Sequence, residues 1–143
     1  MGGFYDVYVL SGDRSKATVV QFFDRFLPER KETADDYPVP RYSDSPEICL
    51  DTADELLTYL EHHPDEPHSI YWASQASGDP YHAMLFATTD GHAVYGLSVV
   101  RNEREYLASL MAFLNSANGY IDFEYPPPDS APKFEKKMVD GVK

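Results

Sequence analysis

The residues best suited to binding a metal ion lie in one short segment, residues 61–68 (EHHPDEPH). Imidazole and carboxylate groups are common zinc ligands. His62 and His63 are consecutive, however, and consecutive residues of a helix point about 100° apart. The residues four positions before them are Thr58 and Tyr59, which are poor zinc ligands, and the spacing does not match HExxH. The segment therefore predicts the exposed end of a helix, and no metal or cofactor is expected.

Covalent catalysis needs a serine, cysteine or threonine beside an oriented base. Ser74 and Ser98 fall on expected strands, and neither lies in a G-x-S-x-G elbow. Cys49 is expected to be a small buried residue, and His82 a core histidine. The 24 acids contain carboxylate pairs by chance, and the sequence places none in a cleft. No catalytic residue is assigned, which favours a protein that is not an enzyme.

A cluster of aromatic residues is compatible with a small-ligand site. Tyr71, Trp72, Tyr81 and His82 lie close together in the sequence and could line one pocket. The same residues also suit the core and surface of a sheet. A small enzyme or ligand-binding domain that uses this cluster is therefore one alternative function.

The elements that would position these residues follow from hydrophobic periodicity and capping signals. Strands are expected at 4–10, 47–50, 69–74 and 120–125, and a hairpin over 81–100 turns at Asp90-Gly91. Ser15 is the expected N-cap of a helix over 16–27. Thr52 and Glu55 form the capping box of a second helix, which ends near residues 62–64. Asn102 is the expected N-cap of a third helix, and Asn118-Gly119 its C-cap. The order β-α-β-α-β-β-β-α-β predicts an α+β fold, with helices packed on one face of a single mixed, mostly antiparallel sheet.

The hairpin register predicts two different faces. A two-residue loop would pair Thr89 with His92, so that His82, Met84 and Phe86 lie on a bulky face toward the helices. The opposite face would carry small side chains that are free to pair with another copy of the chain. A structural homo-oligomer subunit is thus a second alternative; the small-face residues are Ala83, Leu85, Ala87, Val94 and Gly96.

Residues 1–128 are expected to form one domain, and residues 129–143 an extended, poorly ordered tail. Residues 29–46 contain three prolines and no helical period, so a long loop is expected there. The chain has one cysteine, no signal-peptide pattern and no run of about 18 apolar residues, which favours the cytoplasm.

Negative charge is concentrated in one stretch of the chain. The formal net charge is −12, and residues 29–66 hold 12 acids against 3 bases, a net charge of −9. Such a surface repels phosphate, which disfavours nucleic acids and anionic membranes as partners. Such a surface attracts a basic protein partner. The sequence leaves open whether the chain is a monomer or a homodimer.

At the level of general build, the chain resembles the small acidic immunity proteins of bacterial toxin systems. The features that carry this resemblance are the acidic segment, Tyr71-Trp72, the Thr89-Asp90-Gly91 hairpin and the Asn118-Gly119-Tyr120 turn. It implies a protein that binds and neutralises a cognate toxin, frequently a basic nuclease. From the charge and the loop aromatics, the predicted partner-binding residues are Asp35, Asp36, Tyr37, Tyr42, Asp44, Glu47, Asp54 and Glu61.

Overall fold

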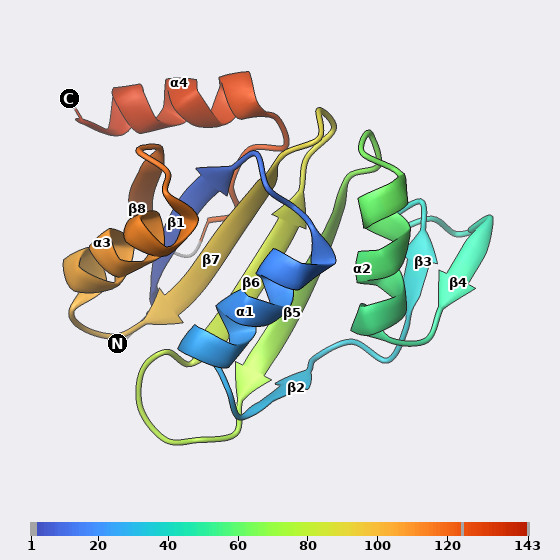
Figure 1. Ribbon diagram of the computed structural model, residues 1–143, viewed down its shortest axis with the longest axis horizontal. Helices are drawn as coiled ribbons and strands as arrows, with labels where there is room; N and C mark the ends of the chain where they lie inside the picture. Colours follow the sequence, from blue (N-terminus) through green and yellow to red (C-terminus); the bar gives the residue numbers. More distant parts are fainter. Residues whose placement is uncertain (1–2, 124, 143) are drawn as a thin grey trace.

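The computed structural model describes residues 3–123 and 125–142, which form an α+β fold. Six antiparallel strands make the main sheet in the order β2-β5-β6-β7-β1-β8, and β3 pairs with β4 in a small second sheet (Figure 1). The strands are β1 (Tyr5–Ser11), β2 (Arg30–Glu32), β3 (Tyr37–Val39), β4 (Ile48–Leu50), β5 (His68–Ser74), β6 (His82–Ala87), β7 (Ala93–Val99) and β8 (Gly119–Phe123). The helices are α1 (Lys16–Phe26), α2 (Ala53–His62), α3 (Glu103–Leu114) and α4 (Ala131–Val142).

The predicted caps of α1 and α2 are confirmed. Ser15 accepts a hydrogen bond from the Thr18 N–H, and Thr52 accepts one from the Glu55 N–H. The return bond of the α2 capping box runs from the Asp51 N–H to Glu55 Oε1 at 3.2 Å, one residue earlier than the pattern predicts. These bonds satisfy amides that have no partner within the helix, and so they fix where each helix begins.

The ends of α3 differ from the prediction. Asn102 precedes the helix but makes no side-chain capping bond, and its φ of 62° lies in the left-handed region. The helix stops at Leu114, where Asn115 adopts the left-handed conformation, and Gly119 belongs to β8. Asparagine tolerates this conformation better than most residues, which explains why Asn115 ends the helix.

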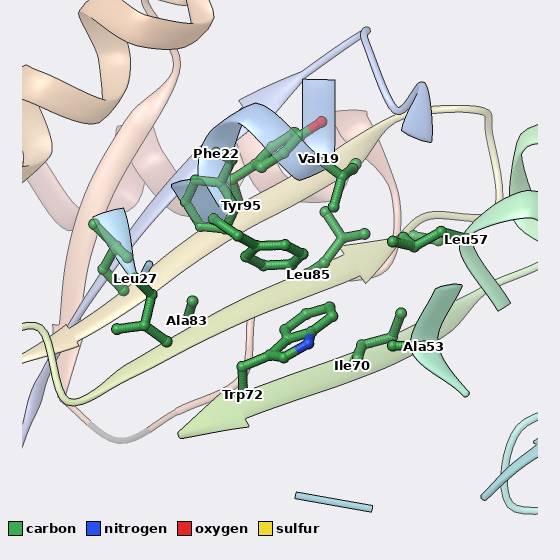
Figure 2. Close-up of a cluster of buried hydrophobic side chains, with 14 of the residues drawn as sticks. Val19, Phe22, Leu27, Ala53, Leu57, Ile70, Trp72, Ala83, Leu85 and Tyr95 are labelled. Carbon is green, nitrogen blue, oxygen red and sulfur yellow. The ribbon is translucent and has the colours of Figure 1, made fainter. Parts of the chain in front are cut away.

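The main core lies between one face of the sheet and the helices α1, α2 and α3. Figure 2 shows Phe22 of α1 and Leu57 of α2 directed toward sheet residues that include Trp72 and Tyr95. Trp72 lies 4.0 Å from the ring of Phe23, centroid to centroid, and only 3% of it is exposed. It is therefore a core residue and does not join Tyr71 and Tyr81 in an aromatic pocket.

The hairpin of β6 and β7 has a three-residue loop, and its register differs by one residue from the predicted one. Thr88 pairs with His92, and Ala87 pairs with Ala93. Gly91 has a φ of +84°, as expected where a turn is followed by a left-handed residue. A one-residue slip turns the side chains of one strand to the other face. Ala83, Leu85 and Ala87 consequently face the helices, whereas Met84 and Phe86 face away.

This register removes the small-residue face on which the homo-oligomer alternative depended. Ala83, Leu85 and Ala87 are buried beneath α1 and α2. Val94 and Gly96 lie on the opposite face, so the five residues do not form one surface.

Residues 131–142 form α4, in place of the expected extended tail. The helix packs on the face of the sheet opposite to α1–α3, so the helices do not all share one face (Figure 1). Phe134 is fully buried there against Tyr120, with a centroid distance of 4.9 Å. Asp90 of the hairpin turn accepts a hydrogen bond from the Ala131 N–H, which caps the helix from a distant part of the chain. Helix α4 thus depends on tertiary contacts that its own sequence does not reveal.

The expected loop over 29–46 contains two short strands. Strand β2 pairs with β5 at the edge of the main sheet, and β3 pairs with β4. Strand β4 thus belongs to the small sheet, where Cys49 is exposed and not buried as predicted. None of the helices in residues 3–123 and 125–142 is both long and apolar enough to span a bilayer.

Candidate functional site: an acidic lobe and a cavity on the sheet

The acidic stretch of the sequence folds into one lobe. Residues 29–66 contain β2, β3, β4 and α2, and the last three of these elements lie together at one side of the molecule (Figure 1). We refer to residues 29–66 as the acidic lobe. The acids of residues 35–66 are therefore also concentrated in space, whereas β2 lies at the edge of the main sheet.

Four of the predicted contact acids are exposed and near the small sheet of this lobe. Asp35 and Asp36 precede β3, whereas Asp44 and Glu47 lie between β3 and β4. The pKa of Tyr59 is raised, first by burial and then by the negative charges of Glu66, Glu47 and Asp65.

Asp54 and Glu61 have intramolecular partners that connect α2 to α1. Asp54 forms an ion pair with Lys16 Nζ at 2.9 Å, and Glu61 Oε2 accepts a hydrogen bond from the Lys16 N–H at 3.1 Å. These two acids hold the helices together, and their charge is less available to a partner than that of the acids near β3 and β4.

The two predicted aromatic anchors, Tyr42 and Tyr37, differ in their exposure to solvent. Tyr42 is 77% exposed and suits an anchor, and Arg41 lies 5.1 Å from its ring centroid. Tyr37 is only 3% exposed, and its hydroxyl donates to Glu32 Oε1 at 2.9 Å. The same oxygen accepts from the Ala53 N–H, so Tyr37 and Glu32 stabilise the start of α2. Tyr37 is a core residue and is not available as an anchor.

The histidines of residues 61–68 all have protein partners. His62 Nδ1 lies 2.9 Å from the Thr58 carbonyl oxygen, and His63 stacks on Tyr59 at 3.8 Å. His68 is buried, with Nε2 2.8 Å from the Pro38 carbonyl oxygen. Among the described residues, no group of three or more histidine, cysteine or acidic side chains is arranged to hold a metal ion.

A second candidate site lies on the face of the sheet that α4 covers only in part. The register places His82, Ser98, Asp6 and Asp122 in one row across β6, β7, β1 and β8. Ser98 Oγ donates to Asp6 Oδ1 at 2.9 Å, and Asp6 is 7% exposed. Ser98 stands between the histidine and the acid, whereas a catalytic triad needs the histidine in the middle. The row is therefore not arranged for nucleophilic catalysis.

The next row toward α4 is aromatic. It contains Tyr71, Met84, Gly96, Tyr8 and Tyr120 on β5, β6, β7, β1 and β8. A Cβ atom at Gly96 would lie 3.0 Å from the Tyr8 ring and 3.1 Å from Met84 Cε, because both side chains lie over this glycine. Tyr8 and Tyr71 each stand nearly perpendicular to Phe86, at 83° and 89°.

Some residues of these two rows line an open pocket of about 340 Å³, which we call the sheet cavity. The segment that leads to α4 closes one side, because Tyr8 Oη donates to the Tyr125 carbonyl oxygen at 2.6 Å. The pKa of Tyr8 is raised, first by burial and then by the charge of Asp6, so this hydroxyl stays protonated. The aromatic lining residues are Phe4, Tyr8, Tyr71, Phe86 and Tyr125, and the polar ones are Asp6, Ser98 and His82.

The predicted aromatic cluster is therefore divided. Tyr71 and His82 line the sheet cavity, whereas Trp72 lies in the main core on the other face. Tyr81 contacts Phe4 at 5.4 Å but does not line the cavity. Sequence reasoning missed Phe4, Asp6 and Tyr8, and it considered Ser98 only as a possible nucleophile. The alternation of residues 4–8 contained the signal, but only the pairing of β1 with β7 brings Asp6 to Ser98.

Comparison of the chain with protein-family models, with curated protein sequences and with solved structures finds no match. The arguments about function therefore rest on the acidic lobe and the sheet cavity themselves.

Proposed function

We propose that this chain is a cytoplasmic protein-binding module that neutralises a basic protein partner, in the manner of the bacterial immunity proteins that it resembles in build. The binding surface is the exposed part of the acidic lobe, with Asp35, Asp36, Asp44 and Glu47 as contacts and Tyr42 as an aromatic anchor. Asp54 and Glu61 border this surface and have a primarily structural role.

One observation supports this proposal most directly. Of the 12 acids in residues 29–66, only Asp54 lies within 4.0 Å of a basic side chain in the part of the chain that the structure describes. Most acids of the lobe therefore form no close ion pair within the described residues, although the charges of Asp65 and Glu66 act on the guanidinium group of Arg14. Mutual repulsion of like charges destabilises a compact state. A partner that supplies lysine and arginine side chains would relieve it.

The expected energetics favour a partner that covers the surface. An exposed ion pair contributes at most about 1 kcal/mol. Close pairs across a protein interface couple by roughly 1.5–7 kcal/mol, and long-range attraction accelerates association. The aromatic ring of Tyr42 beside these acids adds the kind of anchor that often dominates binding energy.

The test uses basic proteins encoded by genes adjacent to this one, expressed and purified, with binding measured by calorimetry and by stopped-flow association. We expect the double variant Asp35→Lys/Asp36→Lys to bind at least about tenfold more weakly, which corresponds to about 1.4 kcal/mol. The association rate of the wild type should fall as salt rises from 0.05 to about 1 M, because the Debye length shortens to about 3 Å.

The control is Glu105→Lys/Glu135→Lys, which changes the net charge by the same amount on exposed positions of α3 and α4. It should retain most of the affinity. Equal binding of both double variants and the wild type would exclude the β3–β4 region from the interface.

A further inference from the structure

We propose that a small pocket at the border of the acidic lobe binds a free α-amino acid with an apolar side chain. The carboxylate of the ligand lies at Arg41, its ammonium group lies at Asp36, and its side chain fills the space between the pocket walls. This ligand differs from the basic protein proposed above, and the inference does not depend on that proposal.

The pocket lies between residues 34–42 and the first half of β5, and we call it the loop pocket. It has a volume of about 150 Å³ and is half enclosed. An apolar cavity of this volume holds a molecule of the size of benzene. The walls are mostly apolar and include Tyr37, Pro38, Tyr42 and Tyr71. The loop pocket therefore has room for the side chain of one amino acid, whereas the charged groups of the ligand stay at its border.

Contacts between the loop and β5 hold these walls in place. His68 Nε2 lies 2.8 Å from the Pro38 carbonyl oxygen, and Tyr42 Oη lies 3.5 Å from Ser69 Oγ. Tyr42 also has a φ of 64°, a left-handed conformation that is rare for a tyrosine. Strained backbone conformations of this kind are concentrated at ligand sites. A pocket that is formed before the ligand binds loses little conformational entropy on binding.

Arg41 supplies a positive charge that has no anionic partner. Within the described residues, no carboxylate oxygen lies within 4.0 Å of its guanidinium nitrogens, and its contact is the ring of Tyr42 at 5.1 Å. The pKa of Tyr71 is raised by burial and by Tyr42, and it is lowered by Arg41, so this charge acts on a wall of the pocket. A guanidinium group binds a carboxylate through paired, charge-assisted hydrogen bonds.

Asp36 supplies the opposite charge in the same pocket. Its carboxylate is exposed and forms no close ion pair with Arg41 or with another basic group of the described chain. Its neighbour Cys49 is a neutral thiol, whose pKa is raised first by burial and then by Asp36. Two opposite charges that line one small pocket without pairing fit a ligand that carries both charges itself.

The acids around the loop pocket favour a zwitterion over a simple anion. Asp35 and Asp44 belong to the same exposed segment, and such a concentration of negative charge repels a ligand with a net negative charge. An α-amino acid has no net charge, so it reaches Arg41 without this long-range repulsion. A simple amine would bring a second positive charge beside Arg41 and leave the guanidinium group without a carboxylate.

The experiment measures the binding of L-leucine to the full chain by NMR titration. Two analogues keep the isobutyl group and remove one charge each, because 4-methylpentanoate lacks the ammonium group and L-leucinamide lacks the carboxylate. Leucine should bind saturably and at least about tenfold more tightly than either analogue, since each analogue loses a charge-assisted contact. Glycine, which has no side chain to fill the pocket, should also bind at least about tenfold more weakly.

Two variants assign the two charges. Arg41→Gln should weaken leucine binding by about fivefold or more without weakening leucinamide, which has no carboxylate to lose a contact. Asp36→Asn should weaken leucine binding by a similar factor without weakening 4-methylpentanoate, which has no ammonium group. A residue that only shapes the pocket would change the affinities of all three compounds together, so this crossed pattern separates direct contact from a structural role.

Matched controls remove the same charges outside the pocket. Arg101→Gln lies on an exposed position before α3, and Asp44→Asn lies in the acidic lobe but does not line the pocket. Both should bind leucine as the wild type does, and thermal unfolding verifies that every variant folds. The proposal is wrong if leucine does not bind saturably, if either analogue binds as tightly as leucine, or if Arg41→Gln loses no more affinity than Arg101→Gln. No protein partner is present in these titrations, so this proposal and that of a basic partner fail separately.

Discussion

Replacement of Arg14 should destabilise the whole protein, because its guanidinium group holds three separate segments together. Nη1 donates to the carbonyl oxygens of Thr88 and His92 at 3.0 and 3.1 Å. Nη2 donates to those of Leu60, His63 and Glu66 at 3.3, 3.0 and 3.2 Å. One side chain thus joins the start of α1 to the end of α2 and to the β6–β7 turn.

The magnitude follows from the number of donor groups. A hydrogen bond with a charged partner contributes about 1.5–3 kcal/mol, and two nitrogens share the five acceptors. The carbonyls near the surface regain water in a variant, so the lower half of that range applies. We expect Arg14→Ala to reduce the free energy of unfolding by about 3 kcal/mol. For a chain of this length that lowers the midpoint of thermal unfolding by roughly 10 °C.

Arg14→Lys is the more informative variant. It keeps the positive charge but replaces a planar fork with a single ammonium group, which cannot reach both sets of carbonyls. We expect it to recover less than half of the loss, as measured by urea unfolding followed by circular dichroism. Arg104→Ala on the exposed surface of α3 serves as the control and should change stability by less than about 0.5 kcal/mol. A lysine variant as stable as the wild type would show that charge alone matters, and a loss in Arg14→Ala no greater than the control would refute the reasoning altogether.

Two further changes test close packing and the attachment of α4. Gly119→Ala should destabilise by about 1–3 kcal/mol in thermal unfolding, because its Cβ would lie 2.9 Å from Leu107 Cδ1 and 3.0 Å from the Tyr8 carbonyl oxygen. Gly12→Ala has open space around the new methyl group and should be near neutral; an equal loss in both would contradict the packing argument. Burial alone would raise the pKa of Asp90, but hydrogen bonds from Thr88 and from the Ala131 N–H lower it below its usual value. A lowered folded-state pKa stabilises the protein above the unfolded pKa of about 3.9, and that stability is lost as pH falls through the folded value. Melting curves from pH 7 to about 2 should therefore show a smaller acid-induced loss for Asp90→Asn than for the wild type, and identical pH profiles would be evidence against this role of Asp90.

The β6–β7 hairpin illustrates where sequence reasoning stopped. Asp90-Gly91 indicated the turn correctly, but the dipeptide is compatible with loops of two or three residues. The longer loop is stabilised by the buried Thr88, whose hydroxyl donates to Asp90 Oδ1 at 2.6 Å. It is also stabilised by the hydrogen bond that Asp90 accepts from the Ala131 N–H of α4. Because of that one-residue difference, the helix-facing side of β7 was predicted correctly and that of β6 was inverted.

The candidate sites show the same division. The concentration of charge in residues 29–66 was visible in the sequence, and so was the exposure of acids in a proline-rich segment. The inward orientation of Tyr37 was not visible, because it depends on Glu32 reaching the N-terminus of α2. The sheet cavity was not visible in the sequence either, because its polar row contains residues as distant in the sequence as Asp6 and Ser98.

By itself, the sequence determined the features that depend on neighbouring residues: the caps at Ser15 and Thr52, the strands with alternating side chains and the sign of the surface charge. Tertiary structure decided which side chains of each strand face the helices, where α3 ends and whether residues 131–142 form a helix. The physical reason is the separation in sequence between the residues that interact. Capping and alternation are satisfied within one turn or one strand, whereas register and the docking of α4 depend on contacts between segments that only the folded chain brings together.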